Sequence, residues 1–542
     1  MTQHATTSDF SRLTPLFVET APEGLSRSLR ELVDLQGRAQ SANVFIVAPE
    51  QQVSLTFGDY RDAVFELADI LAEQGLQPGG RVAVVLVNGL NPAIAILAVI
   101  AAGGVAVPVN PRLTEREIAG VLTHSGASLV LSDQHHSDSL PAMVVQGEQF
   151  THASHEADNP YRLFRPHGIS STDTASVHGV LPAWDDPALI LYTSGTTGQP
   201  KGVVLTHGNL LVNAQYVTAA HRLTSGDRAL CVLPLFHING FVVTLLTPLL
   251  SGGSVIMPQR FHADRFWQWV HDFQATWFSA VPTIFSVLLS HLEPPRDYPV
   301  SLRFARSASA PLPVAVLEEF EQRHRIPVIE TYGISEAACQ VTANPLPPVP
   351  RKPGSAGVPV GNELRVVDEQ QRPVLPGDVG EVIIRGPNVF KGYLNNPSAD
   401  YEALRDNWFH TGDLGFLDLD GYLFLTGRKR EQINRSGEKI SPREVEEVIH
   451  HLPEVESVGV VGIPHQLYGE EVAAFITLRP GRELEPERVR EYCRNYLAGF
   501  KVPREILFIN ELPKGPSGKI QRRRLIDMYH DVTSQQEKET RT

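Results

Sequence analysis

The sequence predicts an α/β protein with a large N-terminal body of several subdomains, built on mostly parallel sheets, and a small α+β C-terminal domain. The first observation is length, because 542 residues correspond to about three or four domain-sized units. The second is that short β-branched runs alternate with longer helical patterns, which is typical of parallel sheets covered by helices. The third is a change of composition at 427–439, a charged stretch that contains glycines near both ends and is typical of a linker.

The N-terminal body begins with a regular alternation. Strands are expected at 82–87, 105–109 and 128–131, with helices at 93–102 and 115–125. The uncharged stretch 92–109 is long enough to consider a membrane helix. Because Gly103, Gly104 and Pro108 interrupt it, we interpret it as a buried helix, a Gly-Gly turn and an inner strand.

Two other regions depart from this alternation. The segment 135–185 is rich in His, Ser, Asp and Pro and has little periodicity, so it is predicted to be an irregular surface insertion. After the linker, the pattern predicts a helix, two strands, a helix and a last strand, at 442–450, 455–462, 471–478, 486–497 and 505–509. We therefore expect an N-terminal domain over 1–430 and a C-terminal domain over 431–542.

Composition and charge narrow the class of protein. The 47 Lys and Arg against 61 Asp and Glu give a net charge of −14, which disfavours nucleic acid or an anionic membrane as the main partner. With 42% hydrophobic and 20% charged residues, the chain is typical of soluble globular proteins. Three cysteines without CxxC spacing, and no secretory signal or targeting address at either end, favour a reducing, cytoplasmic setting.

One motif carries the strongest chemical signal. Residues 191–207 read LYTSGTTGQPKGVVLTH, with hydroxyl residues, glycines and a lysine between two apolar runs. Glycines let backbone N–H groups approach phosphate oxygens, hydroxyls donate hydrogen bonds, and Lys201 adds positive charge. The loop is not a Walker loop, because Gly202 follows Lys201. The residues predicted to hold the anion are Thr193, Ser194, Gly195, Thr196, Thr197, Gly198 and Lys201.

The string YTSGTTGQPKG resembles the phosphate-binding signature of the adenylate-forming superfamily, which includes acyl-CoA synthetases, luciferases and peptide-synthetase adenylation domains. Further stretches match this superfamily in order along residues 50–525. They are LPLFHING at 233–240, SASAPL at 307–312, TYGISE at 331–336, WFHTGD at 408–413, GRKREQINRSGEKISPREVE from 427, and PKGPSGKI at 513–520.

The resemblance implies roles for individual residues. Lys519 would reach the substrate carboxylate and the α-phosphate, Glu336 would bind Mg²⁺, and His237 would gate the passage between the ATP and acyl pockets. A satisfied core histidine is the alternative interpretation of His237. The nucleotide-binding set would comprise the phosphate loop together with Ser309, Ala310, Pro311, Tyr332, Gly333, Ser335, Asp413, Arg428 and Gly437.

Within that set, Tyr332 would offer a face to adenine, Ser335 would contact the α-phosphate, and Asp413 would accept from the ribose hydroxyls. The resemblance also makes the C-terminal domain mobile. It would rotate about Arg430 and present the Lys519 loop for adenylation or the Gly437 segment for thioester formation. The run 522–524, RRR, is either a solvated face or an attractor of coenzyme A phosphates.

The resemblance implies an ATP-dependent acid–CoA ligase that uses ATP, Mg²⁺ and coenzyme A. Stretches at 276–283, 306–310, 344–361 and 433–442 are similar to oxalate–CoA ligases, so oxalate is the first expected substrate. Asn239 and Cys339 stand where that subgroup is expected to carry histidines, and both remove potential positive donors from the acyl pocket. Sulfoacetate, malonate, a small aromatic acid or a fatty acid, or acyl transfer to a carrier protein, therefore remain alternatives.

Overall fold

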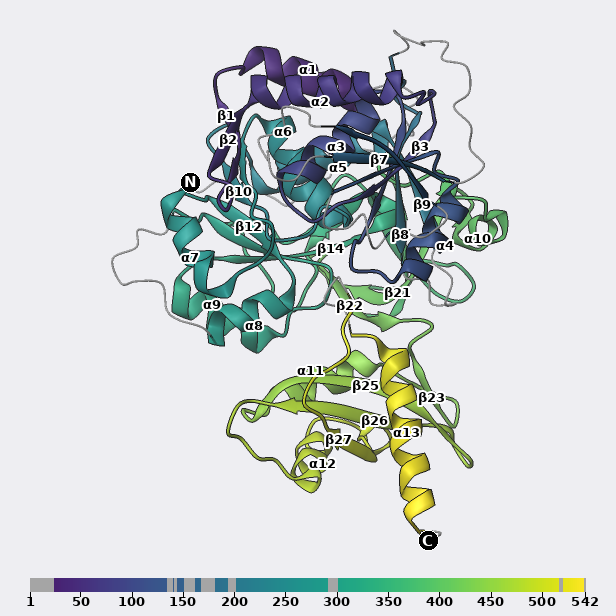
Figure 1. Cartoon of the computed structure of the whole chain (residues 1–542). Helices are drawn as coiled ribbons and strands as arrows, with labels where there is room; N and C mark the ends of the chain where they lie inside the picture. Colours follow the sequence, from purple (N-terminus) through teal and green to yellow (C-terminus); the bar gives the residue numbers. More distant parts are fainter. Residues whose placement is uncertain are drawn as a thin grey trace.

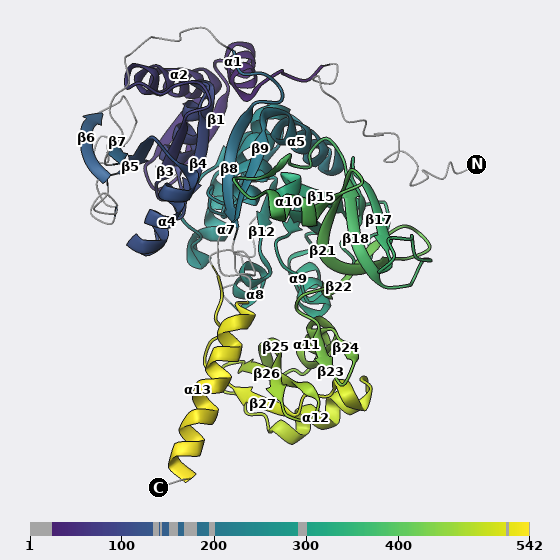
Figure 2. The same cartoon turned by 90° about the vertical axis from the view of Figure 1, so that its right-hand side faces the viewer.

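The computed structural model describes residues 24–133, 140, 144–150, 161–166, 181–193, 201–290, 301–515 and 520–540. Within them, three sheets form the N-terminal body and a fourth forms a smaller C-terminal unit at one end of the molecule (Figure 1). The turned view keeps the same separation, with the C-terminal helix along one side of the smaller unit (Figure 2). This α/β body with a smaller C-terminal domain confirms the predicted fold class.

The first sheet has nine strands, and its central strands pair in parallel from β1 to β14. Strands β12 and β13 are buried along their whole length, although they carry the polar residues Ser279, Arg306 and Ser307. The spatial order is β16 (Val358–Pro359), β15 (Cys339–Ala343), β14 (Val328–Ile334), β13 (Phe304–Ser307), β12 (Trp277–Ala280), β10 (Arg228–Leu230), β11 (Ser254–Ile256), β1 (Val44–Ala48) and β2 (Val53–Thr56).

The second sheet has eight strands, with β8, β4, β3 and β5 parallel at its centre. Its order is β19 (Gly392–Tyr393), β9 (Lys201–Thr206), β8 (Pro187–Thr193), β4 (Val105–Val109), β3 (Arg81–Val85), β5 (Leu129–Ser132), β7 (Tyr161–Pro166) and β6 (Val144–Phe150). The predicted irregular insertion thus contains two strands, β6 and β7. This prediction was wrong because burial of Tyr161, Leu163 and Phe164 extends the sheet over a polar sequence.

Helices cover both large sheets. Helix α3 (Leu90–Ala101) is buried on every side, as its uniformly apolar sequence requires, and no described helix is long and apolar enough to cross a membrane. Helices α2, α4 and α5 begin with capping boxes at Thr56, Thr114 and Thr206. The others of the body are α1 (Leu29–Ala39), α6 (Thr247–Ser251), α7 (Ala263–Asp272), α8 (Pro282–Ser290), α9 (Val314–His324) and α10 (Pro397–Ala403), beside α2 (Phe57–Glu73), α4 (Glu115–Ser125) and α5 (His207–His221).

The third sheet is antiparallel throughout and was not predicted. Strands β17 (Glu363–Val367), β18 (Gly380–Arg385), β21 (Trp408–Leu417) and β20 (Leu404–Arg405) lie in that order, and β22 (Leu423–Arg428) also pairs with β21. The register sets Asp413 opposite Arg428, so this sheet positions two of the predicted nucleotide-binding residues.

The C-terminal unit has its own sheet and apolar core. Strands β24 (Glu438–Ile440), β23 (Ile433–Arg435), β26 (Gly469–Leu478) and β25 (Val455–His465) lie in that order, and β27 (Glu505–Phe508) pairs with β26. Helix α11 (Pro442–His450) begins and ends where the sequence predicted; α12 (Pro486–Arg494) and α13 (Arg522–Thr540) complete the unit.

The charged stretch 427–439 is more structured than a linker. Strand β22 continues to Arg428, and the hairpin of β23 and β24 begins at Ile433. The hairpin forms because Ile433 and Ile440 face each other across it and are both buried in the C-terminal core. Only 429–432 lie between strands, so the expected long linker is reduced to a short connection.

Candidate active site

Three predicted nucleotide-binding residues form a hydrogen-bonded group where two sheets meet. The hydroxyl of Tyr332, near the end of β14, donates to Asp413 Oδ2 across 2.6 Å. Arg428 Nε donates to Asp413 Oδ1 across 2.8 Å, from the neighbouring strand β22. Tyr332 and Asp413 are buried, whereas the Arg428 side chain is 40% exposed. The carboxylate is therefore held rigidly by two donors from different elements.

The charges of this group are fixed by their surroundings. Burial, together with the Asp413 carboxylate, raises the pKa of Tyr332 well above its usual value, so the phenol remains a donor. Asp413 likewise raises the pKa of the Arg428 guanidinium. Each carboxylate oxygen has more than one lone pair, so Asp413 retains acceptor capacity for a pair of hydroxyl donors. That chemistry fits a ribose.

A second group joins the predicted phosphate and magnesium residues. Tyr393 of β19 donates its hydroxyl hydrogen bond to Glu336 Oε1 across 2.9 Å, and Lys201 Nζ lies 4.7 Å from the centre of the Tyr393 ring. Burial and Glu336 raise the pKa of Tyr393, which keeps the phenol protonated. Tyr393 was not predicted as a site residue, because its only sequence signal is a tyrosine in a Gly-Tyr pair outside the recognised motifs.

The phosphate loop is bounded by two strands. Thr193 ends β8, Lys201 begins β9, and these two residues are cross-strand partners. The loop is therefore followed directly by a strand. The remaining loop residues, Ser194, Gly195, Thr196, Thr197 and Gly198, lie outside the described residues, and so does Lys519.

Close backbone approach shapes the segment that carries Glu336. A Cβ atom on Gly333 would lie 1.8 Å from the carbonyl oxygen of Cys339, so only glycine allows β14 to pair with β15 there. Ser335 and Glu336 follow at once in the short 3₁₀ helix η4 (Ser335–Ala337). The tight pairing therefore fixes the position of the predicted magnesium ligand.

The residues expected on the adenine and acyl sides also lie close together. Ser309 follows β13 with a φ of 72°, and its hydroxyl accepts from Asn239 Nδ2 across 3.4 Å. Ala310 and Pro311 continue the same segment toward the surface. His237 is half-buried just before the π-helix η3 (Asn239–Leu246), with its ring centre 4.7 Å from that of Phe236.

The predicted hinge and thioester residues lie at the junction with the C-terminal unit. Arg430 lies in the short connection after β22 and forms an exposed ion pair with Glu402 at 3.7 Å. Gly437, with a φ of 89°, lies between the paired strands β23 and β24. The unit contacts the body through Arg443, whose Nη1 donates to the Leu425 carbonyl across 2.6 Å.

Arg522 has a different role from either predicted alternative. Its guanidinium forms ion pairs with Glu431 at 3.0 Å and Glu446 at 2.5 Å, so it is neither a solvated charge nor free for coenzyme A. Arg523 and Arg524 are exposed, so the coenzyme A hypothesis survives only for them. The difference arises because α13 packs against β25, where Arg522 donates to the Val460 carbonyl, and because Glu446 of the adjacent helix α11 accepts from the same guanidinium.

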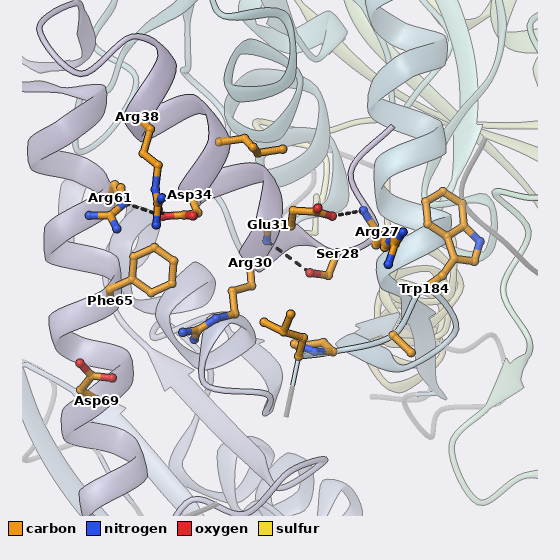
Figure 3. Close-up of a pocket in the computed structure, with 14 residues that line it drawn as sticks. Arg27, Ser28, Arg30, Glu31, Asp34, Arg38, Arg61, Phe65, Asp69 and Trp184 are labelled. Atoms are coloured by element: carbon orange, nitrogen blue, oxygen red, sulfur yellow. Dashed lines mark hydrogen bonds and ion pairs between the residues drawn. The ribbon is translucent and has the colours of Figure 1, made fainter. Parts of the chain in front are cut away.

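A large open cavity lies elsewhere, between α1, α2 and residues 181–184 (Figure 3). It has a volume of about 1050 Å³ and none of the predicted site residues lines it. Three of its arginines are already engaged: Arg61 and Arg38 both donate to Asp34 (Figure 3), and Arg30 and Arg61 lie over the Phe65 ring. The predicted site residues therefore define the candidate active site at the sheet junction, away from this cavity.

Comparison with known proteins agrees with this geometry. The model for AMP-binding enzymes matches residues 33–394, and the model for their C-terminal domain matches 444–519. The chain belongs to the AMP-binding enzyme family. Two curated relatives of this AMP-binding enzyme cover almost its whole length. The sulfoacetate–CoA ligase of Cupriavidus necator is 38% identical over 94% of this chain and 99% of its own. The oxalate–CoA ligase of Arabidopsis thaliana is 40% identical over 87% and 92%, respectively.

Solved structures show the same architecture. ATP-bound MatB from Rhodopseudomonas palustris has a TM-score of 0.79 at 28% identity, covering 93% of this chain and 99% of that one. The o-succinylbenzoate–CoA synthetase of Bacillus subtilis, in complex with ATP and magnesium, has a TM-score of 0.76 at 27% identity, covering 91% and 98%. This AMP-binding enzyme is accordingly an AMP-forming acid–CoA ligase that uses ATP, Mg²⁺ and coenzyme A, as the sequence predicted.

Proposed function

We propose that this enzyme activates a small polar carboxylic acid, oxalate or a short relative of it, and transfers the acyl group to coenzyme A. The observation that carries the proposal is the polar wall around Asn239. Asn239 Oδ1 accepts from Ser279 Oγ across 3.0 Å and from Arg306 Nη1 across 3.1 Å, and all three residues are buried. A long alkyl chain packed there would leave Arg306 Nε, which has no acceptor among the described residues, still without a partner, at a cost of about 1–3 kcal/mol.

In the first half-reaction, a carboxylate oxygen of the acid attacks the α-phosphorus of ATP, and the bond to pyrophosphate breaks. Asp413 would orient the ribose, and Lys201 with the 194–198 loop would hold the β- and γ-phosphates. Lys519 would neutralise the two anions as they approach. A bound Mg²⁺ supplies further charge neutralisation on the phosphates, and Glu336 is the carboxylate we assign to it.

In the second half-reaction, the thiol of coenzyme A attacks the acyl carbon, and AMP leaves. We assign this step to a second orientation of the C-terminal domain, 431–542, reached by rotation about Arg430 relative to the 1–430 domain. Gly437 would then face the acyl adenylate. The short connection 429–432 supports a pivot at this point, because its residues belong to neither β22 nor β23.

Pyrophosphate release over a panel of short mono- and dicarboxylates, with and without coenzyme A, tests the proposal. We expect the highest kcat/KM for a short polar acid and an acyl-CoA product by mass spectrometry. Turnover only with fatty acids of eight carbons or more would overturn the short-acid assignment. AMP release that is independent of coenzyme A, with no acyl-CoA formed, would favour transfer to a carrier protein instead.

Sulfoacetate is the second candidate substrate. The relative from Cupriavidus necator, named a sulfoacetate–CoA ligase, aligns over 94% of this chain, more than the 87% for the Arabidopsis oxalate–CoA ligase. Sulfoacetate belongs in the same panel. We also assign the enzyme to the cytoplasm, since its three cysteines, Cys231, Cys339 and Cys493, are buried free thiols, as a reducing compartment allows.

A further inference from the structure

Arg306 is a buried arginine whose acceptors are all neutral. It lies on β13 and is 1% exposed. Its Nη1 donates to Asn239 Oδ1 across 3.1 Å and to Ser279 Oγ across 3.0 Å, and its Nη2 donates to Gln340 Oε1 across 3.3 Å. Its Nε has no hydrogen-bond acceptor among the described residues, and no described carboxylate pairs with the guanidinium.

This environment is unfavourable for a charge. Burial lowers the pKa of the Arg306 guanidinium, yet arginine stays protonated in proteins, so a positive charge remains in the interior. Buried charges are normally paired. Two more exposed arginines of this body do have carboxylate partners: Arg303, three residues earlier, contacts Asp227 at 2.8 Å, and Arg428 contacts Asp413 at 2.8 Å.

The titratable neighbours of Arg306 do not supply the missing anion. Burial raises the pKa of the Cys339 thiol beside it, although Arg306 itself opposes this shift, so the thiol stays protonated at neutral pH. Burial and the nearby Arg306 lower the pKa of His221 to about 3, so this imidazole stays neutral. The cluster therefore carries one uncompensated positive charge.

The cluster borders the site of chemistry. Asn239 follows His237 by two residues and also contacts Ser309, while Cys339 and Gln340 begin β15 directly after η4, which carries Glu336. Arg306 therefore lies behind the residues to which the acyl side of the site is assigned. The expectation that Asn239 and Cys339 leave this pocket without a positive donor is incomplete, because both side chains lie against an arginine.

We propose that Arg306 binds a second anionic group of the acid, a carboxylate or a sulfonate one or two bonds from the carboxylate that is adenylated. This inference rests on the proposed small-acid ligase function and specifies its substrate class as short dianionic acids. The free Nε and an adjacent Nη–H form a two-donor edge that matches two oxygens of either anion. Arg306 would thus select acids that carry a second anionic group, while the reacting carboxylate remains at the nucleotide.

Kinetics with matched acids test the proposal. The measurement is kcat/KM by pyrophosphate release for malonate, sulfoacetate and oxalate, each compared with the monoanion propionate. In the wild type we expect a clear preference for at least one dianion. Arg306→Gln should lower kcat/KM for that dianion by at least about 30-fold, the scale for removing one partner of a buried charge pair. It should change propionate activity and the KM of ATP far less.

A matched control separates charge recognition from packing. Arg303→Gln removes an exposed arginine that directly precedes β13 and has its own carboxylate partner, so the dianion-to-monoanion ratio should stay at the wild-type value. Arg306→Lys keeps a positive charge and should retain part of the preference for the dianion over propionate. The relative rates with malonate and sulfoacetate show whether carboxylate or sulfonate is favoured.

Several results would overturn the inference. A wild type that uses propionate as well as every dianion contradicts it without any variant, and so does an equal loss for both acid classes in folded Arg306→Gln. If no acid supports pyrophosphate release, the proposed function fails separately. Equilibrium dialysis of labelled oxalate and malonate in the presence of ATP then decides the Arg306 assignment: binding to wild type but not to Arg306→Gln supports it, and absence of binding rejects it.

Discussion

The Tyr332 hydroxyl donates to Asp413 across 2.6 Å and thereby connects β14 of the nine-stranded sheet to β21 of the antiparallel sheet. The two residues are 81 positions apart in the chain. Because each side chain is also fixed by its own strand, the contact would hold the carboxylate that we assign to the ribose in place before ATP arrives. Such preorganisation reduces the entropy lost on binding.

Asp413→Asn should raise the KM of ATP by about 10–100-fold, because hydrogen bonds to a charged acceptor are worth about 1.5–3 kcal/mol. Tyr332→Phe should have a smaller effect, since the ring remains and only one of the two donors to Asp413 is lost. ATP titrations of pyrophosphate release measure both. Tyr422→Phe, whose hydroxyl donates to the Pro350 carbonyl, is the control. An unchanged KM of ATP in Asp413→Asn would contradict the ribose assignment.

Tyr393→Phe should weaken the use of magnesium without abolishing it. The variant removes the donor to Glu336 but keeps the aromatic ring below Lys201. Glu336→Gln, which removes the proposed ligand charge itself, should be more severe. We expect the Mg²⁺ concentration at half-maximal adenylation to rise several-fold in Tyr393→Phe and further in Glu336→Gln. Identical Mg²⁺ curves for Glu336→Gln and wild type would exclude Glu336 as the ligand.

Lys519→Ala should abolish formation of the acyl adenylate and leave thioester formation from supplied acyl-AMP largely intact. The reason is that Lys519 is assigned to one orientation of the C-terminal domain only. The two half-reactions are measured separately, by pyrophosphate release and by acyl-CoA formation. Lys514→Ala, an exposed lysine five residues earlier, should affect neither. Equal loss of both half-reactions in Lys519→Ala would reject the two-orientation hypothesis.

The order of parallel strands and helices could be predicted because each is a local pattern. Helix α4 and helix α11 begin and end at the predicted residues, and α3 followed by β4 agrees with the interpretation of 92–109. The antiparallel third sheet could not be predicted, since its strands are held by pairing with each other and by contacts such as Tyr332–Asp413 that are remote in sequence.

The candidate site likewise contains residues that the sequence could predict and one whose role it could not. Motifs identified Tyr332, Asp413 and Arg428 individually, and the structure brings them within hydrogen-bond distance. Arg306 was visible only as part of a matching string, because its significance depends on what it lacks among the described residues: a carboxylate partner. Whether a buried arginine has a carboxylate partner depends on how the interior packs, here where β12, β13, β15 and helix η3 meet. The spacing of residues in the sequence does not show this.

Arg522→Gln should loosen the start of α13. The variant removes ion pairs to Glu431, beside the proposed pivot, and to Glu446 on α11, and we expect a local loss of about 1–3 kcal/mol for this partly buried network. Hydrogen–deuterium exchange should accelerate in the first turns of α13, and adenylation should slow because Lys519 lies three residues earlier. Arg524→Gln, at an exposed position, is the control. Unchanged exchange in Arg522→Gln would refute the anchoring role.

Glu330→Gln should stabilise the protein at alkaline pH relative to the wild type. Glu330 is 8% exposed on β14, and its Oε2 accepts from the Gly354 N–H across 2.9 Å. Burial, with smaller contributions from Glu447 and Glu321, raises the pKa of Glu330 from 4.5 to about 8, against the opposing effects of the Gly354 N–H and Arg443. A glutamine keeps the acceptor for Gly354 and has no proton to lose.

The direction of the pH dependence follows from where the proton is held. Between the unfolded pKa and about 8, the unfolded chain has released the Glu330 proton and the folded protein has not, so wild-type stability falls by about 1.4 kcal/mol per pH unit from this group. Stability from this group is therefore complete below pH 4.5 and lost by about pH 8. Thermal unfolding should show the Tm advantage of Glu330→Gln growing from pH 5 to pH 8, whereas exposed Glu319→Gln should show a constant difference. An advantage equal at both pH values would mean that Glu330 is ionised throughout.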